Sequence, residues 1–230
     1  MNANTAKNEF EKLCHKAVEC HKCFEKDFVE PSLNHTTIKI AQPRWIGQAY
    51  WDTSPRVLVI MINPGAGNSK DIKRKQIDDE TLALLQGFAS QEKSLYEFFD
   101  HQKEDAKRWR DGKLVKFYTD DLGLEFEKIA FANIAWCSTN GNNYPSKMLE
   151  QCFSEHTQKL LNILSPNIVL LSGGATHRFE NRIELPSAKI IKILHFAHRK
   201  GPSAWKQQAM FIRQEIESWN SPIKRENTNR

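Results

Sequence analysis

Short apolar runs alternate with longer segments of helical periodicity through most of the chain. In the longer segments hydrophobic residues recur at helical spacing, as they do from residue 146 to about 164 and from about 204 to 219. The runs are mostly apolar, and the first of them is typical of a strand buried on both faces of a parallel sheet. They lie at residues 56–62, 128–136, 167–172 and 188–194. This alternation predicts a three-layer α/β/α fold around a central, mostly parallel four-stranded sheet, with ligands at the carboxyl ends of the strands.

The remaining segments predict one domain with a helical insertion. Residues 1–30 are expected to form a helix followed by a cysteine-bearing turn, and Ser146 is expected to cap the later helix. Residues 69–118 are polar and mostly helical in pattern, and Trp109 stands between two arginines there. Basic and aromatic residues so placed can grip a nucleic acid, although a tryptophan that docks on the core is the more common outcome. We expect one domain over residues 1–220 and a disordered tail over 221–230.

The composition is that of an ordinary globular protein, with 40% hydrophobic and 27% charged residues. No apolar run reaches the length of a membrane span, and residues 1–12 lack the apolar stretch of a secretory signal. We therefore expect a cytoplasmic protein without a membrane partner. The net charge is +5, and residues 199–230 hold seven Lys and Arg against three Glu. This excess permits a nucleic-acid partner and is equally compatible with a solvated helix face.

Five cysteines are present, and a cytoplasmic compartment would keep them reduced. Cys20 and Cys23 form a C-x2-C pair, whereas Cys137 follows the second apolar run and Cys152 lies in the helical segment after it. Four thiolates from two distant segments can bind zinc or hold an iron-sulfur cluster. The alternative is that Cys137 and Cys152 are small buried hydrophobic residues. Cys14 has no assigned role.

The order of several further segments resembles that of a known enzyme group. These segments are FANIAWC at 131–137, NNYPS at 142–146, EQC at 150–152 and LSPNIVLLSGGAT at 164–176. With the C-x2-C pair they resemble the central block of the iron-sulfur (family 4) uracil-DNA glycosylases, within the uracil-DNA glycosylase superfamily. The resemblance covers most of the chain outside residues 69–118. It implies a [4Fe-4S] cluster, with zinc as the alternative, held by Cys20, Cys23, Cys137 and Cys152.

Two features depart from the family 4 pattern. The segment INPG at 62–65 is similar to the GINPG loop of the mismatch-specific uracil and thymine glycosylases. The aromatic segment that stacks on a flipped uracil in family 4 has no counterpart. The resemblance therefore implies a monofunctional DNA glycosylase that hydrolyses the N-glycosidic bond of a flipped uracil or related base and leaves an abasic site. Two alternatives stay open: an antiviral enzyme that excises a bulky or hypermodified base from phage DNA, and a non-catalytic DNA-binding protein of the same fold.

The resemblance also implies roles for residues near the reacting sugar and base. Asn63 would orient the attacking water through its amide, while Ile62, Pro64 and Gly65 would complete the base-binding loop. Asn133 would bind the Watson-Crick edge of the base, because a carboxamide both donates and accepts hydrogen bonds. The alternative is that residues 63–68 form an ordinary turn after the first strand and that Asn133 has a structural role at the end of the second strand.

The segment from residue 195 to 203 is similar to the His-Pro-Ser loop of the family. His195 would donate a hydrogen bond to the leaving base, and His198 is the alternative donor. Otherwise His198 would contact DNA together with the other expected DNA-binding residues, which are Gly67, Arg199, Lys200, Pro202 and Ser203. Arg199 or Lys200 could fill the gap left by the flipped base. No lysine stands at an evident nucleophile position, so we expect no strand cleavage, and we expect a monomer.

Overall fold

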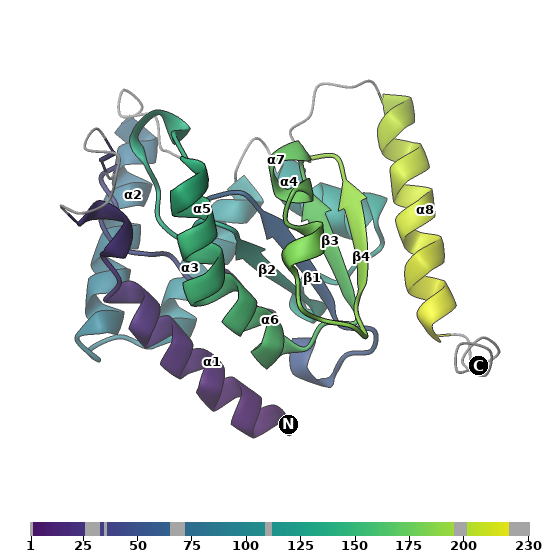
Figure 1. Cartoon of the computed structure of the whole chain (residues 1–230), viewed down its shortest axis with the longest axis horizontal. Coiled ribbons are helices and arrows are strands. Elements are labelled where there is room, and N and C mark those ends of the chain that lie inside the picture. Colours follow the sequence, from purple (N-terminus) through teal and green to yellow (C-terminus); the bar gives the residue numbers. More distant parts are fainter. Residues whose placement is uncertain are drawn as a thin grey trace.

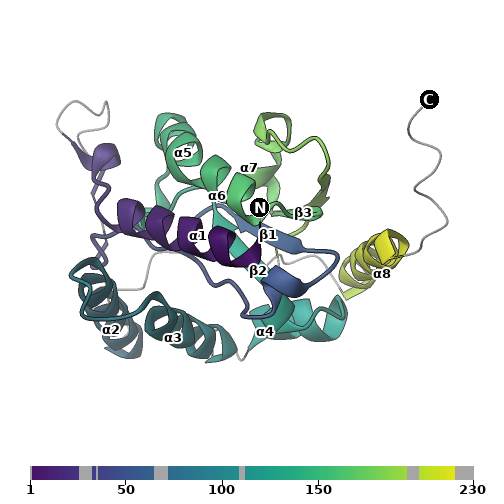
Figure 2. The ribbon, with the colours of Figure 1, turned by 90° about the horizontal axis from the view of Figure 1, so that it is seen from below.

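The computed structural model of the protein describes residues 2–25, 33–34, 36–64, 72–108, 112–195 and 202–220. Within this part of the chain, four parallel strands form one sheet in the order β2-β1-β3-β4. Each strand lies within one of the predicted apolar runs, and helices cover both faces of the sheet (Figures 1 and 2), so the predicted three-layer α/β fold is confirmed. The strands are β1 (Val57–Met61), β2 (Ile129–Asn133), β3 (Ile168–Ser172) and β4 (Lys189–Ile193).

Three of the four strands are fully buried. Every residue of β1, β2 and β3 is buried, including the outer strand β2, whose free side is covered by residues 45–47. Their sequences are apolar except at Asn133 and Ser172, which end β2 and β3. The edge strand β4 alternates instead, with Lys189 and Lys192 exposed between more buried isoleucines. In register, Met61 at the end of β1 lies beside Asn133 at the end of β2. The carboxyl ends of the strands therefore meet at one edge, where α/β sheets bind their ligands.

Helices from distant parts of the chain cover the sheet. Figure 2 shows α5 and α6 on one face, and α3 and α4 on the other. Helix α1 packs along α6 and also contacts α2, whereas α8 lies beside the β4 edge in Figure 1. The α-helices are α1 (Ala3–Val18), α2 (Ile72–Ala89), α3 (Leu95–Arg108), α4 (Lys113–Lys116), α5 (Ser146–Cys152), α6 (Gln158–Leu164), α7 (Gly174–His177) and α8 (Pro202–Asn220). Short 3-10 turns lie at Lys22–Phe24, Tyr50–Asp52, Phe126–Lys128, Asn140–Asn142 and Glu180–Arg182.

The expected insertion shares the core of the domain. Its helices α2 and α3 place Phe88 and Phe99 against α1, where Phe88 stacks on His15 with ring centroids 4.0 Å apart and Phe99 stacks on Phe10 at 6.0 Å. Phe88 and Phe99 are each 1% exposed. A π-helical turn, Phe117–Asp121, follows α4 and carries the insertion back to the sheet. The inserted helices are therefore built into the same hydrophobic core as α1 and the strands.

The helix expected from residue 146 to 164 is interrupted by a second π-helical turn, Phe153–Thr157, between α5 and α6. The expected cap at Ser146 is wrong. Pro145 occupies the cap position and supplies no side-chain acceptor, so Ser146 becomes the first helical residue and its hydroxyl accepts a hydrogen bond from Arg178 at 3.3 Å. A π-helical turn closes over five residues, so side chains five positions apart lie on one side of it.

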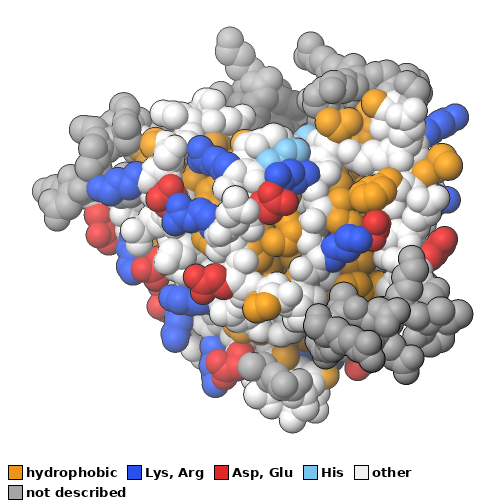
Figure 3. Space-filling model, turned by 45° about the vertical axis from the view of Figure 1, so that its right-hand side comes forward, with side chains coloured by type: hydrophobic (Ala, Val, Ile, Leu, Met, Phe, Trp, Pro, Cys, Tyr) orange, Lys and Arg blue, Asp and Glu red, His pale blue; other side chains and the backbone are white. Residues whose placement is uncertain are grey.

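The face beside β4 and α8 carries interspersed acidic and basic side chains (Figure 3). Lys192 pairs with Glu180, and Lys189 pairs with Glu215 of α8. Among the described residues, no helix is both long and apolar enough to cross a membrane. The expected roles of Trp109 and of the tail at 221–230 fall outside the described residues.

Candidate active site and cysteine site

The loops that follow β1 and β2 remain paired beyond the ends of the strands. The backbone nitrogen of Ile134 donates to the Met61 carbonyl, and that of Ala135 donates to the Ile62 carbonyl, both at 2.9 Å. These two hydrogen bonds extend the pairing by one residue beyond β1 and by two residues beyond β2. They bring Asn63, which follows β1, close to Asn133, which ends β2.

The side-chain amide of Asn63 is held in one orientation by two acceptors. Its nitrogen Nδ2 donates to Oδ1 of Asn142 at 2.9 Å and to the hydroxyl of Tyr144 at 2.7 Å. The same hydroxyl accepts a hydrogen bond from the backbone nitrogen of Thr139 at 3.3 Å. Because the amide has only two N–H donors and both are used, its oxygen is fixed as the group that accepts from a further ligand. Burial raises the pKa of Tyr144, so this hydroxyl keeps its proton at neutral pH.

Asn142 and Tyr144 were not assigned a role from the sequence. The segment NNYPS was noticed only as part of a family-like order of motifs. Asn63 and Tyr144 are 81 positions apart, so no local pattern links them. The one available signal was topological, because a polar loop that follows a buried parallel strand reaches the ligand-binding edge of the sheet.

Asn133 has no exposed surface. With its amide nitrogen turned toward the loop, that nitrogen lies 3.3 Å from the carbonyl of Asn63 and 3.1 Å from that of Ala132. The other end of the amide lies 3.2 Å from the nitrogen of Pro64, which carries no proton and so donates nothing. The carboxamide therefore lies against the loop that carries Asn63, and a base can contact it only after the present cover opens.

The turn after β3 fixes the backbone around His195. Gly173 has φ of 96° and donates from its nitrogen to the Ile193 carbonyl at 2.9 Å. His177 bridges the same strands, because its Nε2 lies 3.1 Å from the Leu171 carbonyl and 3.0 Å from the Ile193 carbonyl. A side chain at Gly173 would meet the Cβ of His195 at 3.2 Å. His195, which is half-buried, thus packs against the turn at Gly173, where the positive φ and the short distance to His195 favour glycine.

The other expected site residues are described only in part. Ile62 and Pro64 are half-buried on the loop after β1. Pro202 and Ser203 form the first turn of α8, and only their backbone is described. The remaining residues lie outside the described ranges: Gly65, Gly67, His198, Arg199 and Lys200.

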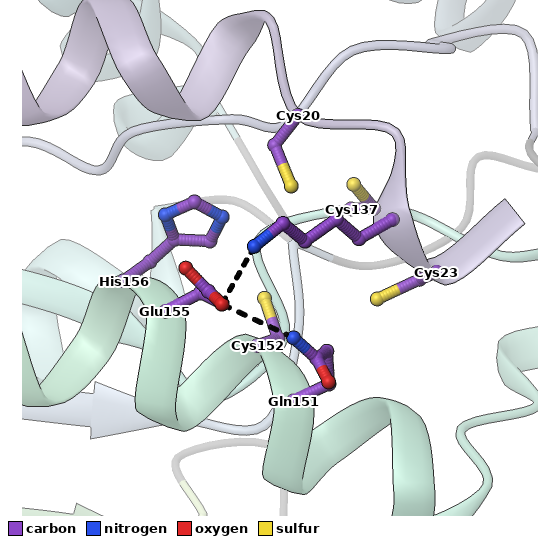
Figure 4. A pocket seen from close by; sticks show the side chains of 8 residues that line it. Cys20, Cys23, Cys137, Gln151, Cys152, Glu155 and His156 are labelled. Atoms are coloured by element: carbon purple, nitrogen blue, oxygen red, sulfur yellow. Dashed lines mark hydrogen bonds and ion pairs between the residues drawn. The ribbon is translucent and has the colours of Figure 1, made fainter. Parts of the chain in front are cut away.

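The four expected metal ligands line one pocket, together with Lys22, Gln151, Glu155 and His156 (Figure 4). Three parts of the chain supply them: Cys20 and Cys23 follow α1, Cys137 follows the extended edge of β2, and Cys152 ends α5. The pocket encloses about 260 Å³ of empty space, its opening included. Cys14 is fully buried within α1 and is not among the lining residues.

Burial and neighbouring sulfurs disfavour the thiolate form of three cysteines in this pocket. Burial raises the pKa of Cys23 to about 12, and it raises the pKa values of Cys137 and Cys152 further. Neighbouring sulfurs raise the three values again, because thiolates repel one another. A metal that binds here must therefore displace protons. The backbone nitrogen of Trp136 already donates to the sulfur of Cys152 at 3.1 Å, which favours the thiolate form.

Two residues that line the pocket, Lys22 and Glu155, form an ion pair. Glu155 accepts from Lys22 at 2.7 Å and pairs with Lys159 at 3.4 Å. Among the described residues, no three or more His, Cys, Asp or Glu side chains form a site for a single metal ion as they stand. The donor set itself consists of four soft thiols from three segments, which is the chemistry of a thiolate-bound zinc ion or an iron-sulfur cluster.

The fold and these two sites define a parallel α/β domain with an asparagine-bearing edge and a four-cysteine pocket. The chain matches no model of a known protein family, and no curated protein matches it. Its function is therefore argued from the geometry of the two sites.

Replacing Gly173 tests how rigidly the β3 turn sets His195. Gly173→Ala is expected to destabilise the protein by about 1–3 kcal/mol, because alanine is strained at φ of 96° and its Cβ would press on His195. Gly174→Ala is the matched control, since no atom lies within 4 Å of a Cβ there and the residue is helical. Urea unfolding of both variants measures the difference. Equal stability of the two variants would contradict the argument.

Proposed function

We propose that this protein is a monofunctional DNA glycosylase, which hydrolyses the N-glycosidic bond of a base flipped out of DNA and leaves an abasic site. The observation that carries the proposal is the fixed amide of Asn63, which uses both protons on Asn142 and Tyr144 beside the buried Asn133. The resemblance of the sequence motifs to uracil-DNA glycosylases supports the same reaction. Uracil or a related deaminated base is the proposed substrate.

Asn63 would position the attacking water. Departure of a base leaves an oxocarbenium-like sugar, and water must then meet C1′ from a defined direction. The oxygen of the Asn63 amide can accept a hydrogen bond from that water, because Tyr144 and Asn142 hold the nitrogen. An amide is too weak a base to take the proton before the bond breaks, so its contribution is positioning and electrostatic stabilisation.

Asn133 and His195 would act on the base itself, and Asn133 would do so once the loop that carries Asn63 has moved off its buried side chain. A flipped base leaves its Watson-Crick edge unpaired, and a carboxamide can meet both a donor and an acceptor on that edge. His195 follows β4 and packs against the turn at Gly173. From there an imidazole N–H could donate to an oxygen of the departing base. A hydrogen bond that strengthens as the base gains negative charge stabilises the transition state more than the bound substrate.

The cysteine pocket would hold a [4Fe-4S] cluster through Cys20, Cys23, Cys137 and Cys152. A bound cluster would supply a cross-link between the end of α1, the loop after β2 and the end of α5. That cross-link joins the segment after β2 to two helices, and so it stabilises the edge of the sheet that carries Asn133.

The reaction is tested by incubating the protein with DNAs that contain uracil, mismatched thymine, hypoxanthine, or hydroxymethylated and glucosylated cytosine. Abasic sites and released bases are then measured. Asn63→Ala is expected to lower the rate by at least about a hundredfold, in the range found when one transition-state donor or acceptor is removed. Asn162→Ala, at an exposed position on α6, is the control. Activity retained in Asn63→Ala would contradict the proposal, and excision of only the modified cytosines would assign the substrate to phage DNA.

Tyr144→Phe tests whether the orientation of Asn63 matters in addition to its presence. Loss of the hydroxyl removes one of two acceptors of the amide, so we expect kcat to fall about tenfold with little change in KM, as one hydrogen bond of about 1–1.5 kcal/mol predicts. The control is Tyr96→Phe, because Tyr96 is 51% exposed on α3. A kcat equal to that of the wild type would remove Tyr144 from the mechanism.

The cofactor is tested by metal analysis and visible absorption of protein purified without oxygen. A [4Fe-4S] cluster predicts about four iron atoms per chain and broad absorption around 400 nm, whereas zinc predicts a colourless protein. Cys152→Ser is expected to lose the iron and the colour. Cys14→Ser keeps both, because Cys14 does not line the pocket. If the protein contains one zinc ion per chain and no iron, the proposal of an iron-sulfur cluster is wrong and the pocket is a zinc site.

A further inference from the structure

A chain of buried hydrogen bonds connects the cysteine pocket to Asn133. Trp136 donates from its backbone nitrogen to the sulfur of Cys152 at 3.1 Å, and its indole nitrogen donates to the hydroxyl of Thr157 at 3.0 Å. Thr157 in turn donates its hydroxyl proton to the backbone carbonyl of Asn133 at 2.8 Å. All the side chains involved are between 0 and 4% exposed.

The π-helical turn Phe153–Thr157 makes this connection possible. Cys152 and Thr157 are five positions apart, and the wider π-helical turn lets both of them reach Trp136 from the same side. An uninterrupted α-helix would rotate one of the two away from the tryptophan. The hydroxyl of Thr157 accepts from Trp136 and donates to the Asn133 carbonyl, with the Ile134 carbonyl also in reach at 3.4 Å. Losing it would leave a buried N–H and buried carbonyl oxygen without this partner.

We propose that Thr157 is a positioning residue that couples the cysteine site to the base-binding position of Asn133. This inference rests on the proposed function. A metal-bound thiolate at Cys152 accepts a stronger hydrogen bond than a thiol does, so occupancy of the pocket fixes the backbone of Trp136. Thr157 transmits that position to Asn133, whose neighbouring amides at Ile134 and Ala135 are paired with the loop that carries Asn63.

Three variants distinguish the hydrogen bonds of Thr157 from the space that its side chain fills in the core. Thr157→Val keeps the shape of the side chain and removes both hydrogen bonds, whereas Thr157→Ser keeps the hydroxyl. Thr53→Val is the matched control, because the Thr53 hydroxyl also donates to a backbone carbonyl, that of Ala49 at 2.7 Å, before the amino end of β1. Each variant is purified as the metal-loaded protein, and its bound metal is measured first.

The first readout is catalysis by the metal-loaded protein. We expect Thr157→Val to lower kcat about tenfold, at a temperature where it stays folded, while its metal content matches that of Thr53→Val; its melting temperature is expected to fall further than that of Thr53→Val, because Thr157 is the more buried of the two. Thr157→Ser is expected to stay within about threefold of the wild type. A kcat for Thr157→Val equal to that of Thr53→Val, or a Thr157→Ser variant as impaired as Thr157→Val, would overturn the proposal.

The second readout does not depend on activity. Backbone hydrogen exchange at Ile134 and Ala135 is compared between metal-loaded and chelator-stripped protein. In the wild type, stripping is expected to raise exchange at both amides at least about tenfold, whereas in Thr157→Val exchange is already raised and stripping adds less. Exchange that responds to stripping equally in both proteins would overturn the coupling. If the wild type removes no base from any DNA, the proposed function fails, and this measurement still decides the role of Thr157.

Discussion

The structure depends on the pairing between the segments that leave β1 and β2. Two backbone hydrogen bonds, from Ile134 to Met61 and from Ala135 to Ile62, hold these segments together after the regular strands have ended. On one side they place Asn63 against Asn133. On the other they set the course of the chain toward Cys137. A single feature of the backbone therefore locates both the candidate active site and one wall of the cysteine pocket.

The π-helical turn between α5 and α6 contacts the same end of the sheet, at the carboxyl end of β2. Its extra residue allows one helical segment to present a thiol and a hydroxyl to the same tryptophan. Trp136 is almost fully buried, so neither bond competes with water. The candidate active site is thereby supported by the sheet on one side and by a hydrogen-bonded helix on the other.

The sequence alone predicted the strands well because the physics that forms them is local. Residues 57–62 are apolar at every position, and a strand buried on both faces of the sheet accommodates them. The cap at Ser146 was mispredicted because residue preference pointed to serine, whereas the turn geometry placed Pro145 first. The resemblance grouped the four cysteines, and the structure brings them to one pocket. Asn142, Tyr144, His177 and Thr157 were missed because each acts through a partner that only the folded chain brings near.

The stacking of the inserted helices on α1 has a consequence for which parts of this protein can be exchanged separately. Phe88 of α2 lies on His15, within two turns of the chain segment that carries Cys20 and Cys23. A replacement that exchanged residues 72–108 for another loop would remove the support under α1 and disturb the cysteine pocket. The helices α2 and α3 therefore depend on their contacts with α1. A chimaera that receives α2 and α3 from this protein must also receive α1.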